Sequence, residues 1–158
     1  RGGLKSLRPN ETGAESTFSN TGLSSWNSDG FVLTSGNNRV TDDGDTYVSW
    51  NWRGNDGASA ASNGSGSITS EVVANTEAGF SVVGYTGTGS NATVGHGLGV
   101  APKMIIIKDR GDTSTWIVYH ESIGNGNLLV LASTQAASST TNFQSTSPTS
   151  SVHIVLQT

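Results

Sequence analysis

The sequence predicts an all-β protein built from antiparallel β-sandwich or jelly-roll-like modules. Serine, threonine, asparagine and glycine together make up 77 of the 158 residues, and only 13% of the residues are charged. Threonine favours strands, whereas glycine, asparagine and serine favour the turns that join them. The apolar residues gather in short β-branched or aromatic segments bounded by turn residues, and no window has the 3.6-residue periodicity of an amphipathic helix.

Six segments are expected to form strands. The first, "TYVSWNWR" at residues 46–53, alternates its side chains so that Val48, Trp50 and Trp52 share one face. This alternation is typical of a half-buried antiparallel strand, and we therefore expect Trp50 and Trp52 to pack in the core. The other five segments, in chain order, are residues 79–87, 103–108, 115–120, 128–131 and 152–156.

A segment without large apolar residues divides the chain into two parts. Residues 55–67 are rich in Gly, Ser and Ala, a composition typical of a flexible linker or long loop. We expect residues 1–54 to form the C-terminal part of a first β module. Residues 68–158 are then expected to form a second β module that lacks its last strand.

A weak internal repeat supports this division. Apolar positions of the first part recur in the same order in the second: Leu4 and Leu7 match Leu128 and Leu131, and Phe31 and Leu33 match Val152 and Ile154. Tandem β modules of this kind build extended fibres and adhesins. Because the sequence begins with Arg1 and not Met, we expect it to be a processed or excerpted piece of a longer chain.

The glycine-rich stretch before residues 103–108 raises the possibility of a phosphate-binding loop. Such a loop lies between a strand and a helix, because the helix N-terminus presents free N–H groups to the anion. Here the glycines lead through Pro102 into a predicted strand, and no Lys-Ser/Thr pair follows them. We therefore interpret the stretch as a connection whose glycines supply positive φ or close backbone approach, with His96 either exposed or bonded to a neighbouring carbonyl.

The stretch from "GSITSEVVANTEAGF" through "GHGLGVAPKMIIIKDRGDTSTWIVYHESIG" closely resembles a module of tail-fibre and other virion proteins of marine bacteriophages. That module is a domain of unknown function often found beside concanavalin-like jelly-roll domains. The first part of the chain, from "LKSLRPN" to "GDTYVSWNWRG", resembles the end of the same module. The resemblance implies a β-sandwich or jelly-roll fold and a virion structural or host-recognition role. It supplies no binding residues.

Two short motifs are more typical of turns than of binding sites. The Arg-Gly-Asp tripeptide at residues 110–112 is one that integrins read, but it lies between two predicted strands and suits a hairpin turn. Asp42, Asp43 and Asp45 can offer oxygen ligands to calcium, but they lack the spaced carboxylates and terminal Glu of an EF-hand loop. A solvated turn is the expected structure there, and calcium binding stays open.

The sequence contains no pattern that favours catalysis. The three histidines lack HxxxH or HExxH spacing, and the GxSxG motif is absent. We expect His120 and Glu121 to mark the end of a strand. A polysaccharide depolymerase needs a carboxylate pair of suitable separation, which Glu71, Glu77 and Glu121 do not visibly form. No catalytic residue, metal or cofactor is expected.

Composition excludes several kinds of partner. The net charge is -4 and the eight basic residues are scattered, so we expect no nucleic acid. The absence of cysteine excludes disulfides and thiolate metal sites. No apolar run approaches the roughly 20 residues that span a bilayer, and we expect no membrane insertion.

Sugar faces stack on aromatic rings, which makes Trp26 and Trp116 the tryptophans most open to an exposed binding role.

We expect a non-enzymatic virion structural protein: a tail-fibre or tail-associated module that serves fibre architecture and host-surface attachment. Its partners would be other virion subunits, in a homo-oligomer, and a host-surface glycan. The main alternative is a lectin-like carbohydrate-binding module of a secreted or cell-surface protein. A depolymerase fragment is a further alternative.

Overall fold

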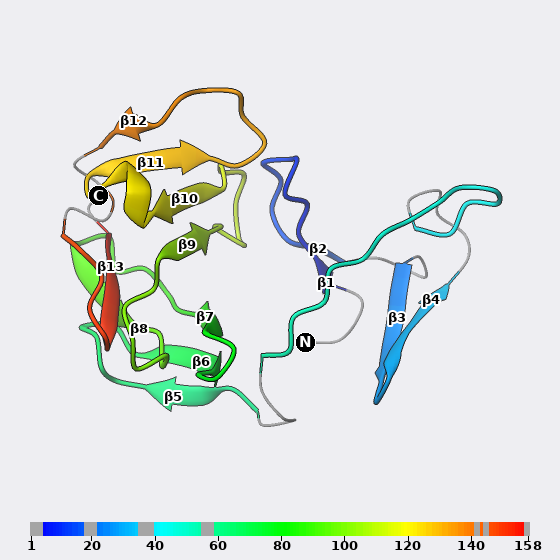
Figure 1. Ribbon diagram of the computed structural model, residues 1–158, viewed down its shortest axis with the longest axis horizontal. Coiled ribbons are helices and arrows are strands. Elements are labelled where there is room, and N and C mark those ends of the chain that lie inside the picture. The colour runs from blue at the N-terminus through cyan, green and yellow to red at the C-terminus, as the bar shows by residue number, and fades with distance from the viewer. Residues whose placement is uncertain are drawn as a thin grey trace. The chain divides into compact units, whose positions relative to one another are not determined.

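The structure, a computed structural model, describes residues 5–17, 22–34, 40–54, 59–140, 143 and 146–156 (Figure 1). Across these residues the chain forms thirteen strands and one short 3-10 helix, and each strand pairs antiparallel to its neighbours. The all-β, sandwich-like fold class predicted from the sequence is therefore confirmed. Two compact units make up the chain, residues 1–50 with 108–116 (unit 1) and residues 51–107 with 117–158 (unit 2).

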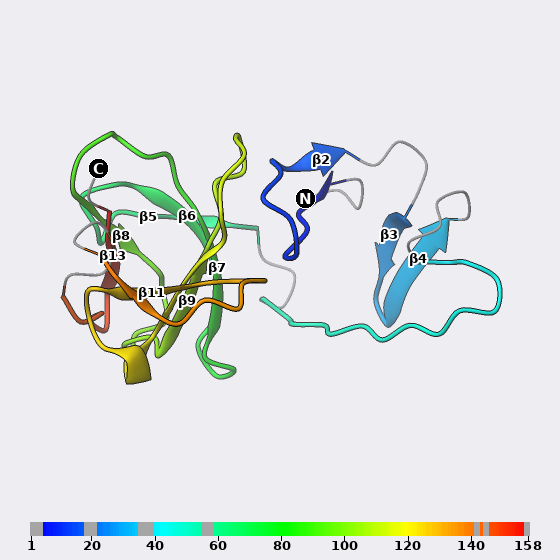
Figure 2. The same ribbon diagram turned by 90° about the horizontal axis from the view of Figure 1, so that it is seen from above.

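Unit 1 contains two small hairpins. Strand β1 (Lys5–Ser6) pairs with β2 (Ser16–Thr17), and β3 (Gly22–Asn27) pairs with β4 (Gly30–Thr34). Figure 2 shows the β3–β4 ribbon from above. The turn between β3 and β4 has two residues, the commonest length for a hairpin. Across it, Trp26 and Phe31 are direct partners whose rings meet edge to face at 6.0 Å.

Unit 2 holds three sheets. Strands β5 (Ala61–Asn63), β6 (Ser70–Asn75) and β7 (Phe80–Gly84) form the first, at the bottom of this unit in Figure 1. Strand β8 (Ala92–Gly95) pairs with β13 (Val152–Leu156). The third sheet consists, in spatial order, of β12 (Ser138–Ser139), β11 (Asn127–Val130), β10 (Ile117–His120) and β9 (Met104–Ile107). A 3-10 turn at Glu121–Ile123 follows β10.

Two hydrophobic clusters stabilise unit 2. In the first, Ile68, Ala92 and Val94 are buried, and Val83 and Tyr85 pack against them. In the second, Tyr119 and Phe143 are buried, and the partly buried residues around them are Ile105, Ile107, Ile117 and Leu128. Because the β9–β10 register places Ile105 opposite Tyr119, alternate residues of these strands supply the second cluster.

Five of the six predicted strands are confirmed. Each confirmed segment contains or overlaps one strand: residues 79–87 contain β7, 103–108 contain β9, 115–120 contain β10, 128–131 overlap β11, and 152–156 form β13. Each of these segments carries β-branched or aromatic residues and finds a neighbouring strand. Eight strands of the described residues lie outside the six predicted segments: β1 to β6, β8 and β12. In β6 and β8, small and polar residues weaken the strand pattern.

The prediction for residues 46–53 is wrong. This segment forms no strand, and Val48, Trp50 and Trp52 are 73%, 74% and 69% exposed, so Trp50 and Trp52 are not core residues. Alternation predicts which side chains share a face. It cannot predict whether a neighbouring strand and a covering layer exist, and both are needed to make that face part of a core.

Within the predicted linker, Ala61–Asn63 form β5 and pair with β6. The side chain of Asn63, in this strand, lies close to the backbone of Gly95 and Gly97. Residues 55–58 of the same linker lie outside the described residues, as does Leu4 of the proposed repeat. The tandem-module interpretation stays a prediction.

Candidate functional site

The glycine-rich stretch at residues 95–99 connects two strands, β8 and β9, and no helix follows it. Gly97 and Gly99 have φ values of +71° and +74°, which L side chains rarely adopt. A Cβ atom on Gly97 would also lie 3.0 Å from Cγ1 of Val72. The interpretation as a connection with positive φ and close backbone approach is confirmed, and the strand–loop–helix arrangement of a phosphate site is not present.

His96 lies within this connection and is 6% exposed. Its Nδ1 atom accepts a hydrogen bond of 2.8 Å from the N–H of Leu98, which leaves the ring proton on Nε2. Nε2 then donates to the carbonyl of Thr149, 3.5 Å away. Desolvation by burial lowers the pKa of His96 to about 4. The ring is therefore a neutral structural group bonded to a carbonyl, one of the two alternatives expected from the sequence.

The Arg-Gly-Asp tripeptide belongs to the β9–β10 connection, residues 108–116, within unit 1. Oδ1 of Asp109 accepts hydrogen bonds from the N–H groups of Gly111 and Asp112, at 2.8 and 3.3 Å. This is the local bonding by which an Asp side chain stabilises a turn. Arg110 forms an ion pair with Glu15. The prediction of a hairpin turn is confirmed.

The acidic residues Asp42, Asp43 and Asp45 also form a turn. The N–H of Asp45 donates to the carbonyl of Asp42 at 3.3 Å, and Gly44 has a φ of +82°. Within the described parts of the chain, no three His, Cys, Asp or Glu side chains form a group that could hold a metal. The turn expected here is confirmed.

The acidic and histidine residues considered for catalysis have separate structural roles. His120 is the last residue of β10, as expected, and its Nδ1 accepts from the N–H of Ser122 at the start of the 3-10 turn. Glu121 pairs with Lys103 at 2.8 Å. Glu71 lies in β6, whereas Glu77 lies in the turn between β6 and β7. The structure thus gives each of these groups a different setting and does not assemble them.

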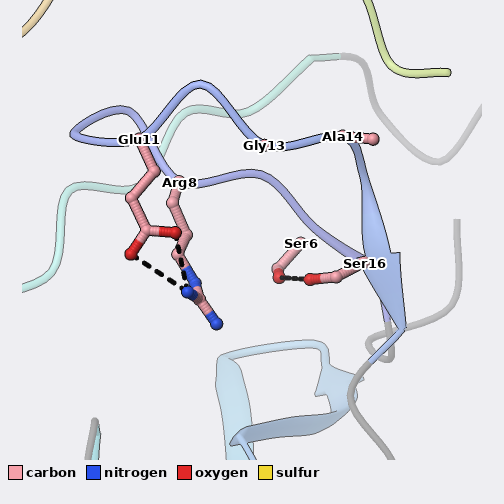
Figure 3. A pocket seen from close by; sticks show the side chains of 6 residues that line it. All are labelled: Ser6, Arg8, Glu11, Gly13, Ala14 and Ser16. Atoms are coloured by element: carbon pink, nitrogen blue, oxygen red, sulfur yellow. Dashed lines mark hydrogen bonds and ion pairs between the residues drawn. The ribbon is translucent and has the colours of Figure 1, made fainter. Parts of the chain in front are cut away.

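Unit 1 contains a pocket of about 190 Å³ lined by Ser6, Arg8, Glu11, Gly13, Ala14 and Ser16 (Figure 3). Arg8 Nη1 donates to both carboxylate oxygens of Glu11, at 3.0 and 2.8 Å. The hydroxyl groups of Ser6 and Ser16 lie 3.2 Å apart and bond to each other. Because the charged groups of the pocket already neutralise each other, it offers no unbalanced charge to a ligand.

An exposed aromatic surface on unit 2 is the stronger candidate site. The rings of Trp52 and Phe80 are stacked, with their planes 20° apart and their centroids separated by 6.2 Å. Phe80 and Val82 lie on the same side of β7 because they are two residues apart, and Val82 is 56% exposed. We call Trp52, Phe80 and Val82 the aromatic platform.

Neighbouring backbone contacts position the platform. Nδ2 of Asn75 donates to the carbonyl of Arg53 at 3.4 Å, directly after Trp52. Gly54 follows, and a Cβ atom there would lie 3.0 Å from Cγ1 of Val73, so the chain packs closely on β6. The β6–β7 register pairs Asn75 with Phe80, which explains why the segment holding Trp52 passes next to the Phe80 ring.

The platform was not predicted from the sequence, because the alternation of residues 46–53 favoured a core position for Trp52. Trp26, considered open to an exposed role, is 62% exposed, as expected. Trp116 is half-buried, and its indole N–H donates to the carbonyls of Arg8 and Glu11 at 3.0 and 3.2 Å. The sequence does place Phe80 and Val82 on one face of a strand and Val83 and Tyr85 on the other. Because both faces are apolar, this alternation does not predict which face is exposed.

In comparisons with known proteins, the sequence matches the family described as Domain of unknown function (DUF7483) over residues 1–158. No curated protein and no solved structure gives a significant match. The part of the chain that the structure describes contains no helix long and apolar enough to cross a membrane. Since the family match spans the whole sequence, the chain belongs to the DUF7483 family.

Proposed function

We propose that the protein is a non-enzymatic structural module of a virion, a tail-fibre or tail-associated part that contributes to fibre architecture and to attachment at the host surface. Its partners are other virion subunits, including copies of itself, and a glycan of the host surface. Strand pairing and the two clusters of unit 2 provide a rigid scaffold. Repetition along a fibre raises the avidity of weak contacts.

One observation carries this proposal. Eleven large hydrophobic side chains of the described residues are exposed, and they are Trp26, Val32, Leu33, Tyr47, Val48, Trp50, Trp52, Val82, Val100, Met104 and Ile106. Isolated exposed apolar residues are normal, but groups of them mark interaction surfaces. Tyr47, Val48 and Trp50 are three of the four residues at positions 47–50 of unit 1. A surface of this kind is expected where one subunit of an assembly contacts another.

A second candidate function is a lectin-like carbohydrate-binding module of a secreted or cell-surface protein. The aromatic platform favours it, because an exposed, supported indole ring suits the apolar face of a sugar. The two candidates differ in the assembly they require. A tail-fibre module belongs to a particle, whereas a lectin-like module binds its sugar as a free protein.

Mass spectrometry of purified particles from the native source tests the proposal. We expect peptides of this sequence to co-purify with the particles. Recovery of the sequence only in the soluble, particle-free fraction contradicts the virion proposal and favours the lectin-like alternative.

A further inference from the structure

We infer that the aromatic platform of unit 2 binds a neutral saccharide, with the exposed face of Trp52 stacked on the C–H face of a pyranose ring. This inference deepens the proposed attachment role and rests on it. It names the residues that contact the ligand and the chemical class of that ligand.

The indole ring is held in place before any ligand arrives. Trp52 is 69% exposed, yet its ring stacks on Phe80, and the carbonyl of the next residue accepts a hydrogen bond from Asn75. Oδ1 of Asn75 accepts from the N–H of Ala78 at 2.9 Å, so the amide is fixed at both ends. A supported ring loses little conformational entropy on binding, which favours binding through a small contact area.

Charge on this side of the sheet favours a neutral ligand. The register places Ser62, Glu71, Val73, Asn75, Phe80, Val82 and Gly84 on the same face of β5, β6 and β7. Glu71 is the single charged residue among these strand positions, and Arg53 follows Trp52 in the neighbouring segment, so this surface carries one charge of each sign. This balance gives no excess of positive charge to attract a phosphate, sulfate or sialic acid group, and no excess of negative charge to attract a cation.

The exposed area is too small for a stable protein partner. Taking about 200 Å² for an aromatic side chain, Trp52 at 69% exposure and Val82 at 56% offer on the order of 200 Å² together. A standard protein interface buries roughly 800 Å² on each partner. One or two sugar rings cover an area of the size available, so a small ligand fits the platform better than a second copy of the chain.

Polar groups continue along the sheet from the aromatic end. Glu71 lies four residues from Asn75 on β6, a separation of about 13 Å along the strand. It is exposed, and its direct partner on β7 is Gly84, which has no side chain. The carboxylate can therefore accept hydrogen bonds from hydroxyl groups of a further sugar unit. The arrangement suits an oligosaccharide better than a monosaccharide.

A glycan array followed by calorimetry tests this inference. The full 158-residue chain is applied to a printed array of neutral, sialylated and sulfated oligosaccharides, and a bound neutral oligosaccharide is then titrated in solution. We expect at least one neutral oligosaccharide to bind. The substitution Trp52→Ala is expected to weaken that binding about tenfold or more, and Trp52→Phe, which keeps a ring, by a smaller factor.

Trp26→Ala is the matched control, because Trp26 is 62% exposed and also contacts a phenylalanine, but lies in the β3–β4 hairpin of unit 1. We expect this variant to bind within about twofold of the unchanged protein. Far-UV circular dichroism confirms that each variant is folded. Equal losses in the two variants, or binding confined to anionic glycans, overturn the inference.

Two further results also overturn it: binding of no glycan at all, and a change of oligomeric state in Trp52→Ala by sedimentation velocity. The second would mean that another copy of the chain covers the platform. Because the particle measurement does not depend on glycans, failure of the saccharide inference is distinguishable from failure of the virion proposal.

Discussion

The guanidinium group of Arg110 forms a bidentate ion pair with the carboxylate of Glu15, 95 residues away in the sequence. Nε donates to Oε2 at 2.9 Å, and Nη2 donates to Oε1 at 3.2 Å. The N–H of Glu15 also donates to the carbonyl of Arg110 at 2.9 Å. Hydrogen bonding to Glu15 raises the pKa of Arg110. The arginine of the Arg-Gly-Asp tripeptide therefore joins two segments of unit 1.

Removing this ion pair should destabilise the protein modestly. The Glu15 side chain is 12% exposed and the Arg110 side chain 46% exposed, so solvent screens the pair in part. We expect Glu15→Gln to lower the free energy of unfolding by about 0.5–1 kcal/mol, measured by urea denaturation, with a smaller effect at high salt. Glu11→Gln breaks the exposed pair with Arg8 and serves as the control. An equal or larger loss in the control would contradict the role of the Arg110–Glu15 pair.

His96 should make stability depend on pH below neutrality. Burial lowers its pKa from the ordinary 6.5 to about 4, so the unfolded chain binds a proton in this range and the folded chain does not. The stabilising contribution is fully present above pH 6.5 and is lost as the pH falls from 6.5 towards 4. We expect a loss of about 1–3 kcal/mol across that window, measured by urea denaturation at several pH values.

The variant His96→Gln tests the assignment. It is expected to be less stable at pH 7.5 and to have a flatter pH dependence between 6.5 and 4, because the titrating group is gone. His120→Gln, which replaces the partly buried histidine at the end of β10, is measured alongside as a second variant that removes an imidazole. An unchanged slope in His96→Gln would assign the pH dependence to other groups.

Substitutions at Gly97 and Gly99 distinguish the cost of backbone strain from the cost of steric crowding. Both have positive φ, but a Cβ atom on Gly97 would lie 3.0 Å from Val72 and 3.3 Å from Ala74, whereas nothing lies within 4 Å of one on Gly99. We expect Gly99→Ala to cost about 1 kcal/mol in unfolding free energy, and Gly97→Ala about 2–3 kcal/mol. Thermal and urea unfolding of both variants measure the difference. Equal costs would mean that the sheet can move away from residue 97.

The exposure of Trp50 predicts a small effect of its removal. Trp50 is 74% exposed, and we expect Trp50→Ala to change the free energy of unfolding by less than about 1 kcal/mol. Phe143, which is 5% exposed in the second cluster, supplies the comparison, because Phe143→Ala should cost about 3–5 kcal/mol. A loss in Trp50→Ala as large as that in Phe143→Ala would restore the core assignment made from sequence.

Local patterns predicted the elements that depend on local chemistry. The β9 and β10 strands follow from β-branched runs, and the positive φ of Gly97 follows from its place in a turn. The contact of Gly97 with Val72 depends on a pairing between segments 25 residues apart, which a single sequence does not reveal. The stacking of Trp52 on Phe80 likewise depends on where residues 52–54 pass over β6.

We propose that this β-structured chain is part of a virion and faces a host surface. Immunogold electron microscopy of particles from the native source, with antibodies raised against the 158-residue chain, tests it most directly. We expect gold label on tail fibres or on the tail of intact particles. Label on free monomeric protein, with unlabelled particles beside it, would contradict the virion proposal and favour the lectin-like module.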